Sequence, residues 1–249
     1  MVFDYYISLG FNCEISFRIR DYLHGKFDSF PFSWAYIDDF SGLVDALNNF
    51  DNLTNSSTTL KPNGMLQLNE FKMSFHLRQK AFTKTGEVDQ NLLNEMTTEL
   101  KSRLAHMIEK FKNVMQSQKR KLFVIKFRNN AECALHLPNI YEYLNKNCAP
   151  QSFEILVVCE EANKVEIPTT TPEHVFVETI KNFADESQTK TDGDLKGWHN
   201  AFNAMEVAFG GKAQKQQKPS KFAAFKSKVK QIGFFKTIGY AFKKLFKKN

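Results

Sequence analysis

The sequence predicts an α/β protein with a single domain, residues 1–210, and a mainly parallel sheet flanked by helices. Apolar runs suited to buried strands alternate with stretches in which apolar residues recur every three or four positions. This alternation is typical of parallel sheets, whose strands are joined by helices. The hydrophobic content is 42% over 249 residues, which is enough for one core of ordinary size.

The expected elements follow one another along the chain. Strands are expected where apolar runs end in polar residues, at 4–10, at one or two places within 64–77, and at 121–130, 153–161 and 174–180. Helices are expected where the apolar spacing is helical, at 13–23, 38–50, 89–115, 137–147 and 193–209. The segment 31–37 is expected to be extended or turn-like, and 52–64 is expected to be a polar loop.

Helix periodicity and capping residues support these boundaries. The pattern over 89–115 is the clearest, with apolar residues at a period of 3.6: Leu93, Met96, Leu100, Leu104, Met107, Ile108 and Phe111. Asn12 is a possible N-cap for the helix over 13–23, and Asp38 or Asp39 for the next helix.

Cys13 is expected at the first turn of a helix, directly after the first strand. Free N–H groups and aligned peptide dipoles at a helix start stabilise a thiolate, which lowers the pKa of the thiol and makes it nucleophilic. The loop after a first parallel strand is also a common place for α/β sites. A second interpretation stays open, in which Cys13 is a small buried residue that only shapes the turn.

A catalytic cysteine needs a histidine that is distant in sequence and near in space. His76 is one candidate, because its neighbours along the expected strand are apolar and would turn it away from the core. His199, at the start of the last helix, is the next. Asp192 and Asp194 precede that helix, where a carboxylate can orient an imidazole or cap the helix.

The sequence lacks the motifs that mark several other classes of protein. Neither the phosphate-binding loop nor the dinucleotide-binding glycine pattern is present, and no cofactor is expected. The four cysteines form no CxxC pair and have no histidine at zinc-ligand spacing, so no metal is expected. With no signal peptide and no apolar run of about 18 residues, we expect a cytoplasmic protein with free thiols and no membrane-spanning helix.

The residues around Cys13 resemble a bacterial family of predicted papain-like cysteine peptidases, which opens with S-L-G-x-N-C and continues with P-F-D-W. The positions that match these two elements are Ser8, Leu9, Gly10, Asn12, Cys13, Pro31, Phe32 and Trp34. Ser33 stands where the family usually has Asp, so a role for that carboxylate does not transfer. The segments around His76 and Trp198 are similar to the family's central histidine segment and its C-terminal Trp segment.

The resemblance covers roughly residues 4–205 and supports Cys13 as nucleophile and His76 as base, with Asp194 as the expected orienter. The expected substrate-binding residues are Ser8, Asn12, Trp34, Trp198 and His199. Members of the family are often associated with surface-polysaccharide synthesis. This implies hydrolysis, or acyl or glycosyl transfer, on an envelope-related substrate. The alternative is a sugar transferase for envelope polysaccharide, or its non-catalytic membrane-bound accessory.

Charge is distributed unevenly along the chain. Residues 212–249 contain twelve Lys and no Asp, Glu or Arg, so removing them from the net charge of +7 leaves about −5 for residues 1–211. Residues 211–220 are expected to form a polar linker. Residues 221–249 are expected to form an amphipathic helix, with Phe-rich and Lys-rich faces.

We expect this basic tail to bind an anionic membrane surface on its cytoplasmic side, without spanning it. The expected membrane-binding residues are Phe222, Phe225, Phe235, Phe242, Lys243, Lys244, Lys247 and Lys248. A nucleic-acid partner would explain the Lys residues and leaves the Phe spacing unexplained, so no nucleic acid is expected. Packing of the tail on the acidic body, or binding to a calmodulin-type partner, are the other interpretations.

Overall fold

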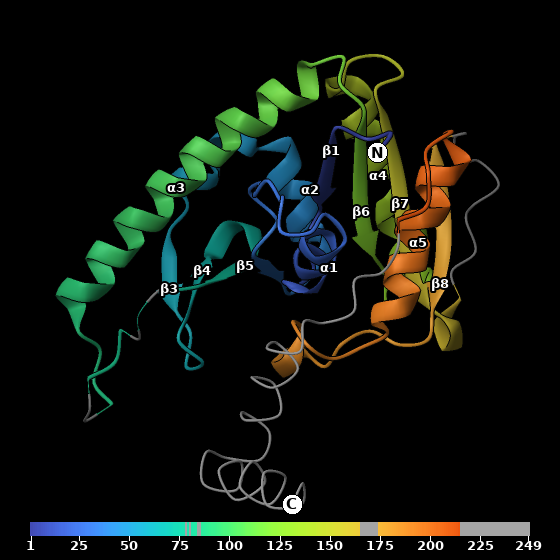
Figure 1. Cartoon of the computed structure of the whole chain (residues 1–249). Coiled ribbons are helices and arrows are strands. Elements are labelled where there is room, and N and C mark those ends of the chain that lie inside the picture. The colour runs from blue at the N-terminus through green and yellow to red at the C-terminus, as the bar shows by residue number, and fades with distance from the viewer. Residues whose placement is uncertain (78, 80, 84–85, 165–173, 215–249) are drawn as a thin grey trace, which may run out of the picture. The chain divides into compact units, whose positions relative to one another are not determined.

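The chain divides into two units, Met1–Ala213 and Gln214–Asn249. The computed structural model (Figure 1) describes residues 1–77, 79, 81–83, 86–164 and 174–214. The predicted linker from residue 215 onward and the predicted amphipathic helix over 221–249 lie outside the described residues. The fold and the candidate site therefore concern the Met1–Ala213 unit.

A four-stranded parallel sheet in this unit confirms the predicted α/β fold. Its strands, in spatial order, are β1 (Tyr5–Ser8), β6 (Lys121–Lys126), β7 (Phe153–Glu160) and β8 (Val175–Ile180). In the register, Tyr5 lies opposite Lys121, and Lys121 lies opposite Phe153. Strands β6 and β7 are buried on both faces almost throughout, which explains their nearly continuous apolar sequences.

The unit also contains a second, antiparallel sheet, whereas the sequence predicted a single, mainly parallel one. Its strands, in spatial order, are β2 (Ala35–Ile37), β5 (Met73–His76), β4 (Met65–Leu68) and β3 (Thr58–Leu60). Strand β3 and a 3₁₀ turn over Phe50–Asn55 occupy much of the region predicted as a polar loop, so that prediction was wrong there. The strand is polar because it lies at the sheet edge with its side chains largely outside the core.

In the described part of the chain, five α-helices cover these sheets. They are α1 (Glu14–Tyr22), α2 (Phe40–Asn48), α3 (Gln90–Gln116), α4 (Asn130–Asn147) and α5 (Leu195–Ala208). Asp39 caps α2 as predicted, because its carboxylate accepts from the backbone N–H of Ser41 at 2.9 Å. No helix among the described residues is both long enough and apolar enough to cross a bilayer.

Helix α4 begins earlier than the sequence predicts. Its cap is Asn129, whose side-chain oxygen accepts from the backbone N–H of Glu132 at 2.9 Å. Pro138, the second residue of the predicted helix, lies inside the observed one. An interior proline removes one helical hydrogen bond. Burial of Leu137 before Pro138 and of Ile140 after it accounts for the continuation of the helix.

The two faces of the parallel sheet carry different helices (Figure 1). On one face, α1 and α5 pack against the sheet through Ile15, Ile19 and Phe202. On the other face lie α2, α3, α4 and the antiparallel sheet, in a core that includes Phe111 and Phe123. The chain therefore leaves β1 toward one face and leaves β6 toward the other.

Candidate functional site

The carboxyl ends of β1 and β6 are neighbours from which the chain departs to opposite faces of the sheet. In open α/β sheets, such divergence opens a crevice beyond the strand ends, and ligands bind there. The loop after β1 contains Asn12 and Cys13, and β6 ends at Lys126. This edge of the parallel sheet is the candidate site.

The loop after β1 makes a tight turn that places Cys13 at the start of α1. Gly10 has φ +91°, and a Cβ at Gly10 would meet the side chain of Ile37 at 2.4 Å, so a glycine is required. The Ser8 hydroxyl accepts from the backbone N–H of Gly10 at 3.2 Å. The Asn12 side-chain oxygen accepts from the N–H of Glu14 at 3.0 Å, which fixes the first turn of the helix.

Cys13 occupies the predicted position with a different pKa from the predicted one. It is the N-cap residue of α1 and is partly exposed, whereas the other three thiols are buried, and none of the four forms a disulfide. Its Sγ lies 3.8 Å from the backbone oxygen of Trp34. Burial raises the pKa of the Cys13 thiol to about 11, so the expectation of a lowered pKa was wrong for this arrangement.

We expect iodoacetamide to alkylate Cys13 before the three buried thiols. Because only the thiolate reacts, the rate should rise about tenfold per pH unit from pH 7 to pH 10, below the pKa of about 11. Peptide mapping by mass spectrometry over a pH series of the native protein measures this rate at each thiol. A rate that levels off near the reference pKa of about 8.5 would contradict the expectation.

His76 ends β5 in the antiparallel sheet, whereas Cys13 follows β1 of the parallel sheet. It is exposed at the end of β5, where Phe75 pairs with Ala35 of β2. Ala35 directly follows Trp34, whose backbone oxygen faces the Cys13 thiol, so Trp34 and His76 lie at the same end of the β2–β5 pair. Among the described residues, no hydrogen bond joins the thiol and the imidazole.

His199 lies at the far end of α1 from Cys13. Its ring contacts the ring of Tyr22 with centroids 5.2 Å apart. Tyr22 ends the helix that Cys13 caps, so the helical rise of 1.5 Å per residue separates the two positions by about 13 Å. His199 is therefore not the partner of this thiol in the present arrangement.

Asp194 and Trp198 have structural partners. The Asp194 carboxylate accepts from the N–H groups of Gly197 at 2.8 Å and Lys181 at 2.9 Å, so it caps α5. Burial would raise its pKa, but these backbone hydrogen bonds outweigh burial and lower it. Trp198 is 1% exposed and lies in the core beside Phe202. Neither residue is brought to Cys13 by the described contacts.

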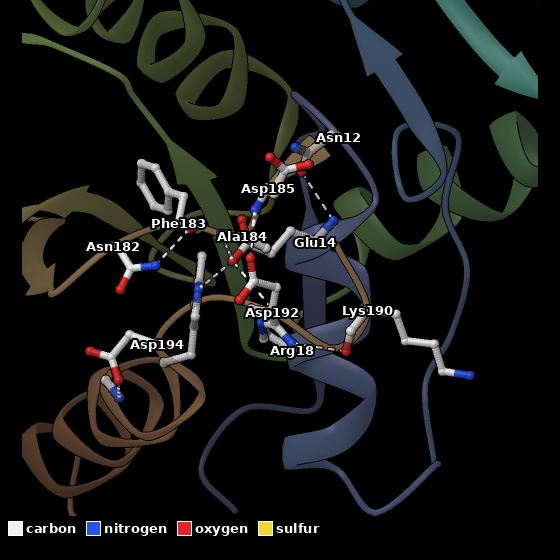
Figure 2. A network of polar contacts seen from close by, with 12 residues as sticks. Asn12, Glu14, Arg18, Asn182, Phe183, Ala184, Asp185, Lys190, Asp192 and Asp194 are labelled. Carbon is white, nitrogen blue, oxygen red and sulfur yellow. Dashed lines mark hydrogen bonds and ion pairs between the residues drawn. The ribbon is translucent and has the colours of Figure 1, made fainter. Parts of the chain in front are cut away.

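Sequence reasoning missed a buried ionic cluster beneath the same edge of the sheet, of which Figure 2 shows Glu14 and Arg18. Glu14 is completely buried, and its carboxylate lies 2.6 Å from the ammonium of Lys126 and 3.4 Å from the guanidinium of Arg18. The same carboxylate accepts from the Trp198 indole at 3.1 Å and from the backbone N–H of Ala184 at 2.9 Å. Burial lowers the pKa of Lys126, and the Glu14 charge opposes that shift.

The cluster also holds the segment between β8 and α5, residues 181–194, against α1. Arg18 donates to the backbone oxygens of Lys190, at 3.2 Å, and Asp192 (Figure 2). Phe183 of this segment places its ring 4.5 Å from the Lys126 ammonium. A sequence signal for the cluster existed: Lys126 ends an otherwise apolar run of β6, where a charged side chain needs a partner.

The arrangement provides a thiol and helix N–H groups at the carboxyl edge of the parallel sheet, and an exposed imidazole at the end of β5 in the antiparallel sheet. Two surface hollows elsewhere, lined partly by Tyr5 and by Phe3, lie near the amino end of β1, away from Cys13. Comparisons with protein-family models, curated proteins and solved structures give no match, so the site is interpreted from its own geometry.

Proposed function

We propose that this protein is a cysteine-dependent hydrolase or transferase of the papain-like kind, with Cys13 as its nucleophile. The observation that supports this most is the position of Cys13, the one partly exposed thiol, at the start of α1 and at the carboxyl edge of the parallel sheet. The resemblance of the sequence around Cys13 to the papain-like family supports the same assignment. Asp194 is left out of the mechanism because its carboxylate caps α5.

The thiol is protonated before substrate binds, since its pKa is about 11. In the proposed reaction, substrate occupies the space beside Trp34 and brings the His76 imidazole into reach of the thiol. His76 takes the proton, the sulfur attacks the substrate, and the imidazolium returns the proton to the leaving group. Water, or a second substrate in a transferase, then releases the product from the sulfur.

Replacing His76 with Ala is expected to slow acylation of Cys13 by p-nitrophenyl acetate about 100-fold, the low end of general-base effects. The release of p-nitrophenolate and the mass of the Cys13 peptide follow the reaction. His106→Ala is the matched control, because His106 is an exposed residue on α3. Equal acylation rates in the wild type and His76→Ala would show that His76 is not the base. Equal rates of p-nitrophenolate release in the wild type and Cys13→Ala would show that Cys13 is not the nucleophile.

We propose that the protein acts at the cytoplasmic face of a membrane on an envelope-related substrate. The basic tail supports the location, because its twelve Lys and its Phe residues at helical spacing are typical of interfacial helices. The association of the resembling family with surface-polysaccharide synthesis supports the substrate class.

A second function is favoured by the raised pKa of Cys13. In this alternative the protein is an envelope-polysaccharide sugar transferase or its accessory, and Cys13 only shapes the loop after β1. Calorimetric titration with a nucleotide sugar distinguishes the two. Equal binding by the wild type and Cys13→Ala, together with no acylation of the wild-type thiol, would support the alternative.

A further inference from the structure

One face of helix α1 is partly exposed and runs from Cys13 toward the end of the helix. Phe17 lies four positions after Cys13, and Arg20 lies three positions after Phe17, which is the spacing of a single helix face. All three side chains are partly exposed, whereas Ile15 and Ile19 are buried against the parallel sheet. The proposed nucleophile therefore shares an accessible surface with an aromatic ring and a guanidinium.

The Arg20 guanidinium lies over aromatic rings and has no acidic partner at contact distance. Its Cζ is 4.9 Å from the centre of the Phe17 ring and 6.0 Å from that of the Trp34 ring. Asp21 attracts the guanidinium electrostatically, but consecutive side chains on a helix do not face each other. In the described part of the chain, no hydrogen bond or ion pair engages the Arg20 side chain. Its planar fork of N–H donors is therefore open to a ligand.

Trp34 connects the thiol with the guanidinium. Its backbone oxygen lies 3.8 Å from the Cys13 Sγ, and its ring centre lies 6.0 Å from the Arg20 Cζ. The indole is held by the Phe17 ring, whose centroid is 5.2 Å away in an edge-to-face contact, and by a 2.9 Å hydrogen bond from its Nε1 to the Ser29 hydroxyl. Because Trp34 is partly exposed, a ligand bonded to the thiol can lie along this ring and reach the guanidinium.

The other cations of α1 and of the end of β6 already have anionic partners. Arg18 and Lys126 are buried and share the Glu14 carboxylate, and Arg128 forms an ion pair with an acid of α4. Among these described cations, Arg20 alone has no ion pair. It is therefore the cation of this edge of the sheet that can bind an anion from solution without losing an existing contact.

We propose that Arg20 is a specificity residue that selects substrates with a carboxylate on the acyl group transferred to Cys13. The inference rests on the proposed cysteine chemistry and narrows the substrate to an ester or amide with an acidic acyl chain. Acylation bonds the sulfur to the carbonyl carbon and breaks the bond to the leaving group, which receives the thiol proton through His76. Meanwhile the guanidinium fork pairs with the two carboxylate oxygens. One guanidinium matches the single charge of a carboxylate, whereas a phosphate monoester carries about two charges.

The helix geometry sets the length of the acyl chain. The rise of 1.5 Å per residue places the backbone of Arg20 about 10 Å beyond that of Cys13. Long side chains of a helix point back toward its start, and the guanidinium follows this rule because it lies over Phe17. The remaining span is roughly 7–8 Å, which an extended chain of about six methylene groups covers.

Two esters of matched length test the selection on the full-length protein. p-Nitrophenyl hydrogen suberate has a carboxylate at the far end of its acyl chain, and its methyl ester has the same chain without the charge. We expect the charged ester to acylate wild-type Cys13 about fivefold faster than the methyl ester, the upper range for an exposed ion pair. Arg20→Met keeps an apolar side chain of similar length over the rings and should bring the ratio of the two rates to about one. Arg103→Met, at an exposed position of α3, is the matched control and should keep the wild-type ratio.

Salt provides a second measurement that needs no variant. The preference of the wild type for the charged ester should shrink as NaCl is raised, because salt screens the attraction between the carboxylate and the guanidinium. If the charged ester reacts no faster than its methyl ester, or if Arg20→Met retains the preference, Arg20 does not select the substrate and Cys13 stays the nucleophile. If the mass of the Cys13 peptide shows no acylation by either ester in the wild type, the proposed function fails and the inference fails with it.

Discussion

Replacing Glu14 with Ala is expected to lower the free energy of unfolding by about 3–5 kcal/mol, because it leaves buried cations without their anion. Lys126 and Arg18 have side chains only 2% exposed, and both bond the Glu14 carboxylate. The variant also frees the Trp198 indole and the backbone N–H of Ala184. Urea denaturation of the full-length protein, followed by tryptophan fluorescence, measures the change because Trp198 lies in this cluster.

The control for this variant is Asp51→Ala. The Asp51 carboxylate forms an ion pair with Lys112, and its side chain is 81% exposed, so the loss should stay below about 1 kcal/mol. The double variant Glu14→Leu, Lys126→Met should recover part of the loss, because it removes one buried charge of each sign. If the free energy of unfolding of Glu14→Ala lies within about 1 kcal/mol of the wild-type value, the cluster is not important for the stability of the fold.

The parallel sheet was predictable because its two central strands, β6 and β7, are buried on both faces. The run over Phe153–Glu160 is apolar for that reason, and it is correspondingly easy to recognise. Strand β3 was missed because an edge strand with exposed side chains has the composition of a loop. The start of α4 was missed because its cap, Asn129, lies in the segment 121–130, which was expected to be a strand ending in polar residues.

The position of Cys13 was predictable and its pKa was not. Gly10 and the helical spacing after residue 13 are local signals, and they place the thiol at a helix start. The raised pKa arises from burial, which depends on residues distant in sequence such as Trp34. The Glu14–Lys126 pair was missed for the same reason. The two residues are 112 positions apart, and a contact between distant residues produces no periodic pattern in the sequence.

The basic tail is expected to bind the full-length protein to anionic vesicles, whereas residues 1–211 alone should stay in solution. The electrostatic part of this expectation comes from the twelve Lys against a body of about −5. Each Lys near an anionic surface contributes about 1 kcal/mol to binding before screening. At physiological ionic strength, salt screens the attraction between charges that are more than about 8–10 Å apart. Binding, measured by vesicle sedimentation, should therefore weaken as salt rises.

Binding should persist in part at high salt, because burial of the Phe side chains contributes about 25 cal/mol per Å² regardless of charge. Replacing Phe235 and Phe242 with Ser should release the protein even at low salt, since interfacial binding needs an apolar face that enters the bilayer as well as the charge. Replacing Lys243, Lys244, Lys247 and Lys248 with Gln should weaken binding to anionic vesicles and leave binding to neutral ones unchanged. If residues 1–211 sediment with vesicles as well as the full chain does, the membrane-binding surface lies on the α/β unit, and the tail serves a protein or nucleic-acid partner.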